Sequence, residues 1–290
     1  MCFNCLADRP TTTSGRPGRP RLPRRRGWLL AAGAALAAPA LAQVDVGKTS
    51  GFRKLVPAET LENSARQEYA QVLAAARAKG QLAGPGDPQL QRLHRIARRL
   101  IPYASQWNGD VARWRWEVNL INSEQINAWC MPGGKIAFYT GILDKLKLSD
   151  DEVAMIMGHE MAHALREHAR ERLAKTQATG IGLSLAAQLL GWGQVGDVAA
   201  NLGTQLLTLK YSRDDETEAD LVGLEIAARA GYNPQASVSL WTKMVNVKGG
   251  AGAAGSSSFL STHPAGPERI QQLQANLPKV QGLYQRAPKT

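Results

Sequence analysis

Gly158–His163 reads Gly-His-Glu-Met-Ala-His, and this stretch organises the rest of the 290-residue chain. The pattern is His-Glu-x-x-His, inside a run whose composition is typical of a helix. His159 and His163 are four residues apart, so on an α-helix they project from one face, one turn apart. Two neutral imidazoles at this spacing can bind one Zn²⁺, and Glu160 between them can act as a general base toward water. Because so short a pattern recurs by chance, the rest of the sequence has to support this interpretation.

The positive charge of the chain is concentrated near its N-terminus. The formal net charge is +11, but residues 1–42 hold seven arginines and a single acid, Asp8. The remaining residues carry 28 basic and 23 acidic side chains, a net charge of +5, with no Lys/Arg stripe interleaved with aromatic residues. We therefore predict no nucleic-acid partner.

Residues 1–42 are typical of a cleavable export signal. Arg24–Arg26 forms a positive region, and Trp28–Ala38 is an apolar core. Ala40–Ala42 matches an Ala-x-Ala cleavage pattern, which places the start of the mature chain at Gln43. The apolar run is shorter than the roughly 20 residues that span a bilayer, so cleavage is favoured over a membrane anchor. The arginine run also faintly resembles a twin-arginine signal, which leaves the export route open.

The cysteine content agrees with export. Cys2 and Cys5 leave with the signal and lie in no lipoprotein cleavage context, so Cys130 alone remains and no internal disulfide is expected. We predict a periplasmic protein of a bacterial-type cell and leave peripheral association with a membrane open.

Helices and a short β-rich region are predicted ahead of the His-Glu-x-x-His stretch. The helices are Ala58–Lys79 and a second one that Asp87 caps and Pro88 begins. The β-rich region alternates with period two or has β-like composition at Arg113–Ile121, Asn127–Cys130 and Lys135–Tyr139, with Met131–Gly134 as a turn. We predict a small, mostly antiparallel sheet of two or three strands.

The His-Glu-x-x-His stretch itself lies on a helix predicted from Asp150 to about Lys175, after a short helix at Gly141–Leu148. Ser149, with Glu152 three residues on, forms a capping box at its start. The early part of this helix is apolar and is expected to be buried, whereas Arg166–Arg172 is charged and is expected to be solvated.

Helices are also predicted for most of the remaining chain. Residues 176–210 are apolar and are predicted to form two helices of a core or a lid. A helix opens within Tyr211–Asp220 and runs to Ala230, and a last amphipathic helix is predicted at about Gly266–Leu277. Gly249–Ser258, rich in Gly, Ala and Ser, is predicted to be a flexible loop.

A catalytic zinc ion needs a third protein ligand. The extended pattern His-Glu-x-x-His-x-x-Gly-x-x-His is absent, because Arg166 and Ala169 occupy the last two positions and His168 lies one residue off. Glu216 and Asp220 are four residues apart on the later helix, so one carboxylate can bind zinc while the other accepts a hydrogen bond from a ligand histidine. Acids at a helix start also compensate the helix dipole, which is the alternative for this pair alone.

Together these motifs resemble those of peptidase family M48, in its periplasmic soluble branch. The resemblance extends from about residue 60 to about residue 280. It is carried by Glu152–His163, Tyr211–Gly223, Thr262–Pro264 with Arg269 and Ile270, and by Asn127-Ala128 with Pro132–Gly134 and Thr140-Gly141.

The resemblance implies an α+β, mainly helical gluzincin fold with a small β-sheet beside the zinc-binding helix. It implies one Zn²⁺ per chain, held by His159, His163 and Glu216. Glu160 is then the general base, and Asp220 holds a ligand histidine. His263 is expected near the metal, where it either stabilises the oxyanion or occupies the open position in a latent state.

The expected domains follow from the predicted export signal and from the resemblance. They are a cleaved signal peptide at 1–42, an irregular lead-in at 43–57, a zinc metallopeptidase domain at 58–280 and a C-terminal tail at 281–290.

We therefore expect a zinc metalloendopeptidase whose substrates are unfolded or misassembled envelope polypeptides. An extended substrate segment is expected to pair with the sheet edge at Asn127, Ala128 and Trp129, since main-chain pairing demands no single sequence. A sheet that serves only for packing is the alternative for that region. For the whole protein, the alternatives are a latent or weakly active chaperone-like protein gated by His263, and a zinc hydrolase of non-peptide amides.

Overall fold

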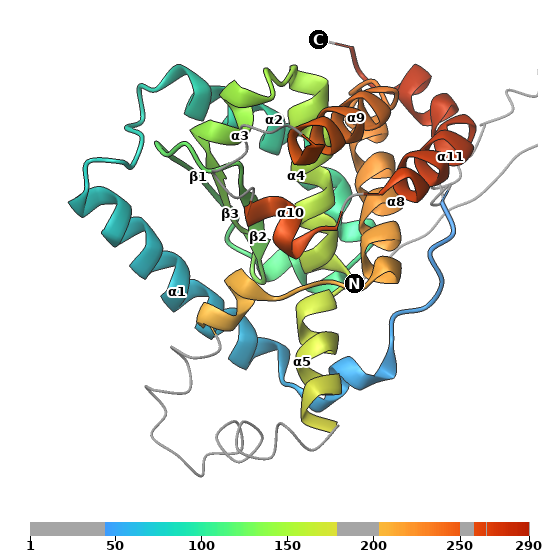
Figure 1. The fold of residues 1–290 in the computed structure, drawn as a ribbon. Helices are drawn as coiled ribbons and strands as arrows, with labels where there is room; N and C mark the ends of the chain where they lie inside the picture. The colour runs from blue at the N-terminus through green and yellow to red at the C-terminus, as the bar shows by residue number, and fades with distance from the viewer. Residues whose placement is uncertain (1–43, 179–202, 250–257, 265, 290) are drawn as a thin grey trace, which may run out of the picture. The chain divides into compact units, whose positions relative to one another are not determined.

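The computed structural model of the chain describes residues 44–178, 203–249, 258–264 and 266–289 (Figure 1). All of them belong to one of the two units into which the chain divides, Leu41–Thr290. The predicted export signal, most of the predicted helices of 176–210 and most of the Gly249–Ser258 loop lie outside the described residues.

Helices make up most of the described chain, and a three-stranded sheet lies among them. The helices are α1 (Ala58–Ala78), α2 (Pro88–Leu100), α3 (Thr140–Lys145), α4 (Asp150–Leu165), α5 (His168–Ala178), α8 (Arg213–Arg229), α9 (Ala236–Gly249), α10 (Ser258–Thr262) and α11 (Pro267–Arg286). The strands are β1 (Glu117–Ile121), β2 (Ala128–Met131) and β3 (Lys135–Tyr139). Three short 3₁₀ helices span Gly51–Leu55, Ile101–Gln106 and Gly109–Arg113. The mainly helical α+β class expected from the sequence is confirmed. Within the described residues, no helix combines the length and the hydrophobicity that a membrane span requires.

The sheet is mixed, with the strand order β1-β3-β2. β2 and β3 form an antiparallel hairpin whose turn uses Gly133 and Gly134 at φ angles of 80° and 75°, a region that favours glycine. β1 and β3 pair in parallel, so the prediction of a mostly antiparallel sheet is wrong for this pair. The reason is that β2 lies at the edge of the sheet and β3 in the middle. β3 therefore pairs with β1, and these two strands run in the same direction. The strand expected from Arg113 begins only at Glu117, after a 3₁₀ helix.

Helix α4 is the centre of the packing. Its residues are buried from Glu152 to Leu165, and it contacts α8, β2, α2 and α9. Figure 1 shows α4 between the sheet on one side and α8 with α11 on the other. A helix that is covered on all sides can hold reactive side chains in fixed positions, which a surface helix cannot.

The contact between α4 and α8 depends on two glycines. A Cβ atom on Gly158 would lie 2.9 Å from the carbonyl oxygen of Gly223, and a Cβ atom on Gly223 would lie 2.6 Å from the backbone nitrogen of His159. Only glycine allows two helix backbones to approach so closely. This close approach brings the first turns of α8 beside the His-Glu-x-x-His stretch.

The single helix predicted from Asp150 to about Lys175 is in fact two helices. α4 ends at Leu165 and α5 begins at His168, and Glu167 between them adopts a φ angle of 60°. The break turns two side chains inward, so that Arg166 and His168 are 8% and 2% exposed. The prediction of a solvated segment is wrong at Arg166 and His168, because the carboxylate of Glu218 lies beside both side chains, and also at Ala169, which is buried.

The helix starts follow the predicted signals. Asp87 Oδ1 accepts hydrogen bonds from the backbone N–H groups of Gln89 and Leu90, and both bonds of the capping box formed by Ser149 and Glu152 are present. These predictions are confirmed. α8 begins with a second capping box, Ser212 with Asp215, which the sequence analysis did not identify.

Both ends of the described chain are more ordered than predicted. In the lead-in, Val44 is buried and its N–H donates to Glu225, and the 3₁₀ helix at Gly51–Leu55 packs against α5. At the other end, α11 continues to Arg286 rather than ending near Leu277. Buried apolar residues continue at helical spacing beyond that point, and their burial outweighs the roughly 3 kcal/mol cost of Pro278 inside the helix.

Candidate metal centre

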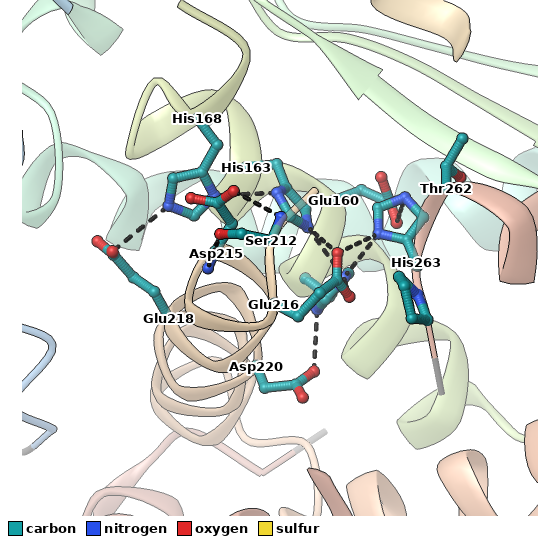
Figure 2. Close-up of polar contacts among 12 residues, drawn as sticks. Glu160, His163, His168, Ser212, Asp215, Glu216, Glu218, Asp220, Thr262 and His263 are labelled. Carbon is teal, nitrogen blue, oxygen red and sulfur yellow. Dashed lines mark hydrogen bonds and ion pairs between the residues drawn. The ribbon is translucent and has the colours of Figure 1, made fainter. Parts of the chain in front are cut away.

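Four buried side chains present possible ligand atoms to one another. His159 and His163 come from α4, Glu216 from the first turn of α8, and His263 from the residue directly after α10. One ligand atom from each lies within 4.8 Å of the other three. The four residues that the sequence analysis placed at the metal are thus brought together in space (Figure 2).

The spacing of these atoms matches a zinc coordination shell. His159 Nε2 and His163 Nε2 are 3.1 Å apart, and the Glu216 carboxylate lies 3.5 Å from the first and 3.4 Å from the second. His263 Nδ1 lies 3.0 Å from Glu216 Oε1 and 3.3 Å from His159 Nε2. Tetrahedral ligands 2.0–2.1 Å from a zinc ion are about 3.3 Å from one another.

The protonation of the histidines also fits a cation. Asp220 Oδ1 lies 3.0 Å from His159 Nδ1, so it accepts the Nδ1–H and leaves the lone pair of Nε2 facing the cluster. Burial lowers the pKa of His163 well below its usual value, more strongly than the hydrogen bond to Glu216 raises it, so His163 is neutral. Lone pairs and a carboxylate that face one another at these distances repel unless a proton or a metal cation lies between them. Nitrogen and oxygen donors of this kind suit Zn²⁺.

Arg269, on α11, supplies positive charge behind the ligands. Its guanidinium lies 2.5 Å from Glu216 Oε2 and makes two hydrogen bonds, of 2.7 and 2.6 Å, to Asp220. Burial raises the pKa of both carboxylates, but nearby groups, Arg269 among them, outweigh burial, so both pKa values lie below their usual range. In the sequence, Arg269 stands out only as part of the family motif. No spacing pattern identifies its role, because that role depends on how α11 packs on α8.

Glu160 lies on the open side of the cluster. Its Oε1 is 3.6 Å from His263 Nε2 and has no hydrogen-bond partner among the described residues. Burial raises the pKa of Glu160, and the opposing effects of His263 and His159 do not cancel it. A carboxylate with a raised pKa, next to reacting groups, can take up a proton and release it again.

A cleft of about 220 Å³ begins at Glu160 and His163. Its walls come from the start of α1, from β2 with the preceding Asn127, from residues 206–211 and from residues 261–263. Asn127, Ala128 and Trp129, the predicted substrate edge, all line it. Within the described residues β2 pairs only with β3, so its other edge has no partner strand.

His163 has two further neighbours outside the ligand cluster. The ring of Tyr211 stacks on it at a centroid distance of 3.9 Å, and His168 Nδ1 lies 2.9 Å from His163 Nδ1. Its position in the sequence, one residue away from the third-ligand position of the extended pattern, excludes His168 as a metal ligand. The structure agrees that His168 is not in the ligand cluster, but places it against the far side of a ligand.

Comparison with known proteins identifies the family. The sequence model of Peptidase family M48 matches residues 88–277. The chain belongs to peptidase family M48. Zinc is the metal that the peptidases of this family use, in agreement with the donor set of the cluster.

Several curated relatives in this family align with most of the chain. Over 204 residues it is 34% identical to the mitochondrial metalloendopeptidase OMA1 of Schizosaccharomyces pombe, which covers 68% of this chain and 57% of the relative. Over 200 residues it is 26% identical to the metalloprotease YcaL of Escherichia coli, with 67% of this chain and 72% of the relative covered. The metalloprotease LoiP of Escherichia coli is 27% identical over 188 residues, covering 61% of this chain and 69% of the relative.

The alignments leave part of the larger relatives uncovered. The chain spans 57%, 32% and 50% of the OMA1 proteins of Schizosaccharomyces pombe, Arabidopsis thaliana and Saccharomyces cerevisiae.

Proposed function

We propose that this chain is a zinc-dependent metalloendopeptidase that cleaves unfolded or misassembled polypeptides of a bacterial-type cell envelope. The observation that carries the proposal is the ligand cluster, which faces, together with Glu160, a cleft bounded by the edge strand β2. Membership of family M48 and relatives named metalloendopeptidases support the reaction class.

Each functional residue around the cleft has a separate role in the proposed reaction. His159, His163 and Glu216 would hold a zinc ion, which when bound would supply a Lewis acid able to polarise a peptide carbonyl and to lower the pKa of water toward about 7. Glu160, whose Oε1 is free to accept, takes a proton from the attacking water and passes it to the leaving amine. His263 lies between Glu160 and Glu216 and can donate a hydrogen bond to the developing oxyanion.

The shape and lining of the cleft are evidence that the substrates are extended polypeptides. A segment that pairs with the free edge of β2 presents its main chain to the cluster without demanding one sequence, and only an unfolded segment can pair in this way. The cleft is lined mainly by apolar side chains, among them Leu61, Met131 and Leu207. Such a lining favours segments that expose apolar residues, which misfolded proteins do.

Casein cleavage by the purified protein tests the activity. We expect cleavage that a chelator abolishes and added zinc restores. Glu160→Gln should lower the rate by about 10²–10⁴-fold and still bind one zinc ion. Glu124→Gln is the matched control, because Glu124 is exposed and its ion pair among the described residues is with the exposed Lys145. A protein that binds zinc and shows no chelator-sensitive cleavage contradicts the proposal.

The envelope location is proposed from residues 1–42 alone, since their composition is that of an export signal. Fusion of these residues to a reporter enzyme that is active only after export tests it. Reporter activity is expected, and a reporter that stays inactive in the cytoplasm contradicts this location.

The position of His263 favours a second candidate, a latent chaperone-like protein of the same fold. His263 Nδ1 lies within the ligand cluster, 3.3 Å from His159 Nε2, where it can complete the coordination shell. His263→Ala separates the two. Faster casein cleavage identifies His263 as a latch, whereas lost cleavage identifies it as a group that stabilises the transition state.

A further inference from the structure

We propose that His168 and Glu218 form a relay that holds His163 in its metal-binding tautomer. The inference deepens the metal site of the proposed function and rests on it. His168 and Glu218 are positioning residues in this proposal, because neither contacts the metal or a substrate.

The relay lies on the far side of His163, and it runs from the buried His168 to the partly exposed Glu218. His168 Nδ1 lies 2.9 Å from His163 Nδ1, and His168 Nε2 lies 3.5 Å from Glu218 Oε2. The other oxygen of Glu218 pairs with Arg166. Figure 2 shows His168 between His163 and Glu218, on the side of His163 that faces away from His263.

If His163 binds a metal, the protons on the imidazole nitrogens of the relay can be placed in one way. His163 offers Nε2 to the cluster, where it lies 3.4 Å from Glu216 Oε1, so its proton must be on Nδ1. Two facing nitrogens share one proton, and His168 Nδ1 is therefore the acceptor. A His168 with a single proton then carries it on Nε2, which lies 3.5 Å from Glu218 Oε2 and has no hydrogen-bond partner among the described residues.

The opposite arrangement would disable the site. If His168 donated from Nδ1, the proton of His163 would move to Nε2 and occupy the position where the metal binds. The carboxylate of Glu218 disfavours this arrangement, because it needs a donor and a deprotonated His168 Nε2 cannot provide one. Arg166 keeps Glu218 in place with its guanidinium.

The two ligand histidines of α4 are therefore held in parallel ways. His159 Nδ1 reaches a carboxylate–arginine pair directly, Asp220 with Arg269. His163 Nδ1 reaches a second such pair, Glu218 with Arg166, through the imidazole of His168. The two acids lie two residues apart on α8.

The relay also accounts for the break between α4 and α5. Glu167 adopts a φ angle of 60°, which few residues other than glycine do. This turn directs Arg166 and His168 inward toward Glu218. A continuous helix would not place both of them against α8.

Zinc affinity, measured on the full chain by competition with a chelator, tests the relay. His168→Leu keeps the bulk of the side chain but removes the acceptor, and should raise the Kd for zinc about 10–100-fold. His168→Asn places an oxygen near the position of Nδ1 and should restore the Kd to within a few-fold of the wild-type value. His94→Leu is the matched control, a half-buried histidine on α2 that should leave the Kd unchanged.

A double-mutant cycle tests whether Glu218 acts through His168. Glu218→Gln alone should weaken zinc binding, but adding it to His168→Leu should cause no further loss. Additive losses would overturn the relay. A Kd for His168→Leu within twofold of the wild-type value would overturn it as well, and would leave His168 a packing residue.

Nitrogen-15 NMR of the imidazoles of the zinc-loaded wild-type protein gives an independent readout, which holds even if His168→Leu fails to fold. We expect protons on His163 Nδ1 and His168 Nε2, and a proton on His168 Nδ1 would refute the proposal. Neither readout requires proteolysis. A protein with the relay but no casein cleavage would therefore contradict the proposed function and not the relay.

Discussion

The two sides of the metal centre are filled differently. Toward α8 and α11 the ligands meet charged groups and close backbone contact, with Asp220 and Arg269 against them and Gly158 against Gly223. Toward β2 they meet a cleft of about 220 Å³ with mainly apolar walls. We call these the closed side and the open side. The difference implies that metal binding and stability depend on the closed side, whereas substrate binding depends on the open side.

Removal of Arg269 should give the largest effect on the closed side. Arg269→Leu leaves the carboxylates of Asp220 and Glu216 buried without their cation, and a broken buried ion pair costs about 3–5 kcal/mol. We expect this loss in the free energy of unfolding of the metal-free protein. The loss should be smaller with zinc, because zinc neutralises Glu216. Denaturant unfolding with and without zinc measures both values.

Arg113→Leu is the control for this experiment, since the ion pair of Arg113 with Asp110 is exposed to solvent and should contribute little to the free energy of unfolding. Equal losses with and without zinc would mean that Arg269 compensates Asp220 alone.

Adding a methyl group at the contact between α4 and α8 should have the next largest effect on stability and on zinc affinity. In Gly223→Ala the new Cβ would lie 2.6 Å from the backbone nitrogen of His159, so the two helices must separate. Overpacking of this kind costs about 1–3 kcal/mol, and the separation moves Glu216 away from the histidines. Thermal unfolding and zinc affinity should therefore both fall. Gly84→Ala is the control, because nothing lies within 4 Å of its new Cβ. An unchanged zinc affinity would show that the closed side tolerates a wider spacing of the helices.

A polar substitution on the open side should leave the metal untouched. Leu207 lines the cleft and is half-buried. Leu207→Ser removes apolar contact with a bound polypeptide and should raise the KM for casein by about tenfold, as expected for the loss of roughly 1–3 kcal/mol of apolar binding. Zinc affinity should not change. Val245→Ser is the control, because Val245 is an exposed apolar residue on α9 that does not line the cleft. A fall in zinc affinity instead of a rise in KM would erase the distinction between the two sides.

The closed side was partly predictable because its ligands are arranged locally. The spacing of His159 and His163, and that of Glu216 and Asp220, each place two side chains on one helix face, so a sequence pattern is enough to pair them. The start of α4 was predictable for the same reason, since a capping box involves only four consecutive residues.

The parts that the sequence did not reveal depend on contacts between elements distant in the chain. Arg269 acts only because α11 packs on α8. His168 reaches His163 only because the backbone turns at Glu167. The parallel pairing of β1 with β3 depends on which strand takes the outer position of the sheet. Spacing within one element carries no information about any of these.

The start of α4 lies on neither side and provides the smallest expected effect. The carboxylate of Glu152 accepts hydrogen bonds from the backbone N–H of Ser149 and from Ser239, and pairs with Lys243 at 2.7 Å. Burial raises the pKa of Glu152, but these partners outweigh it and hold the pKa below its usual value. Glu152→Gln should therefore lower the free energy of unfolding at pH 7 by about 1 kcal/mol.

The pH dependence of this loss follows from the direction of the pKa shift. Because the folded-state pKa of Glu152 is depressed, its contribution is complete above the unfolded value of about 4.3 and is lost as the pH falls through the folded-state pKa. The difference between wild type and Glu152→Gln, measured by urea unfolding, should therefore vanish in acid. A difference that stayed constant with pH would assign the loss to the shape of the side chain rather than to its charge. Zinc affinity should be unchanged in this variant. If it fell, the stability of α4 as a whole would govern metal binding, and the closed side would have no special role.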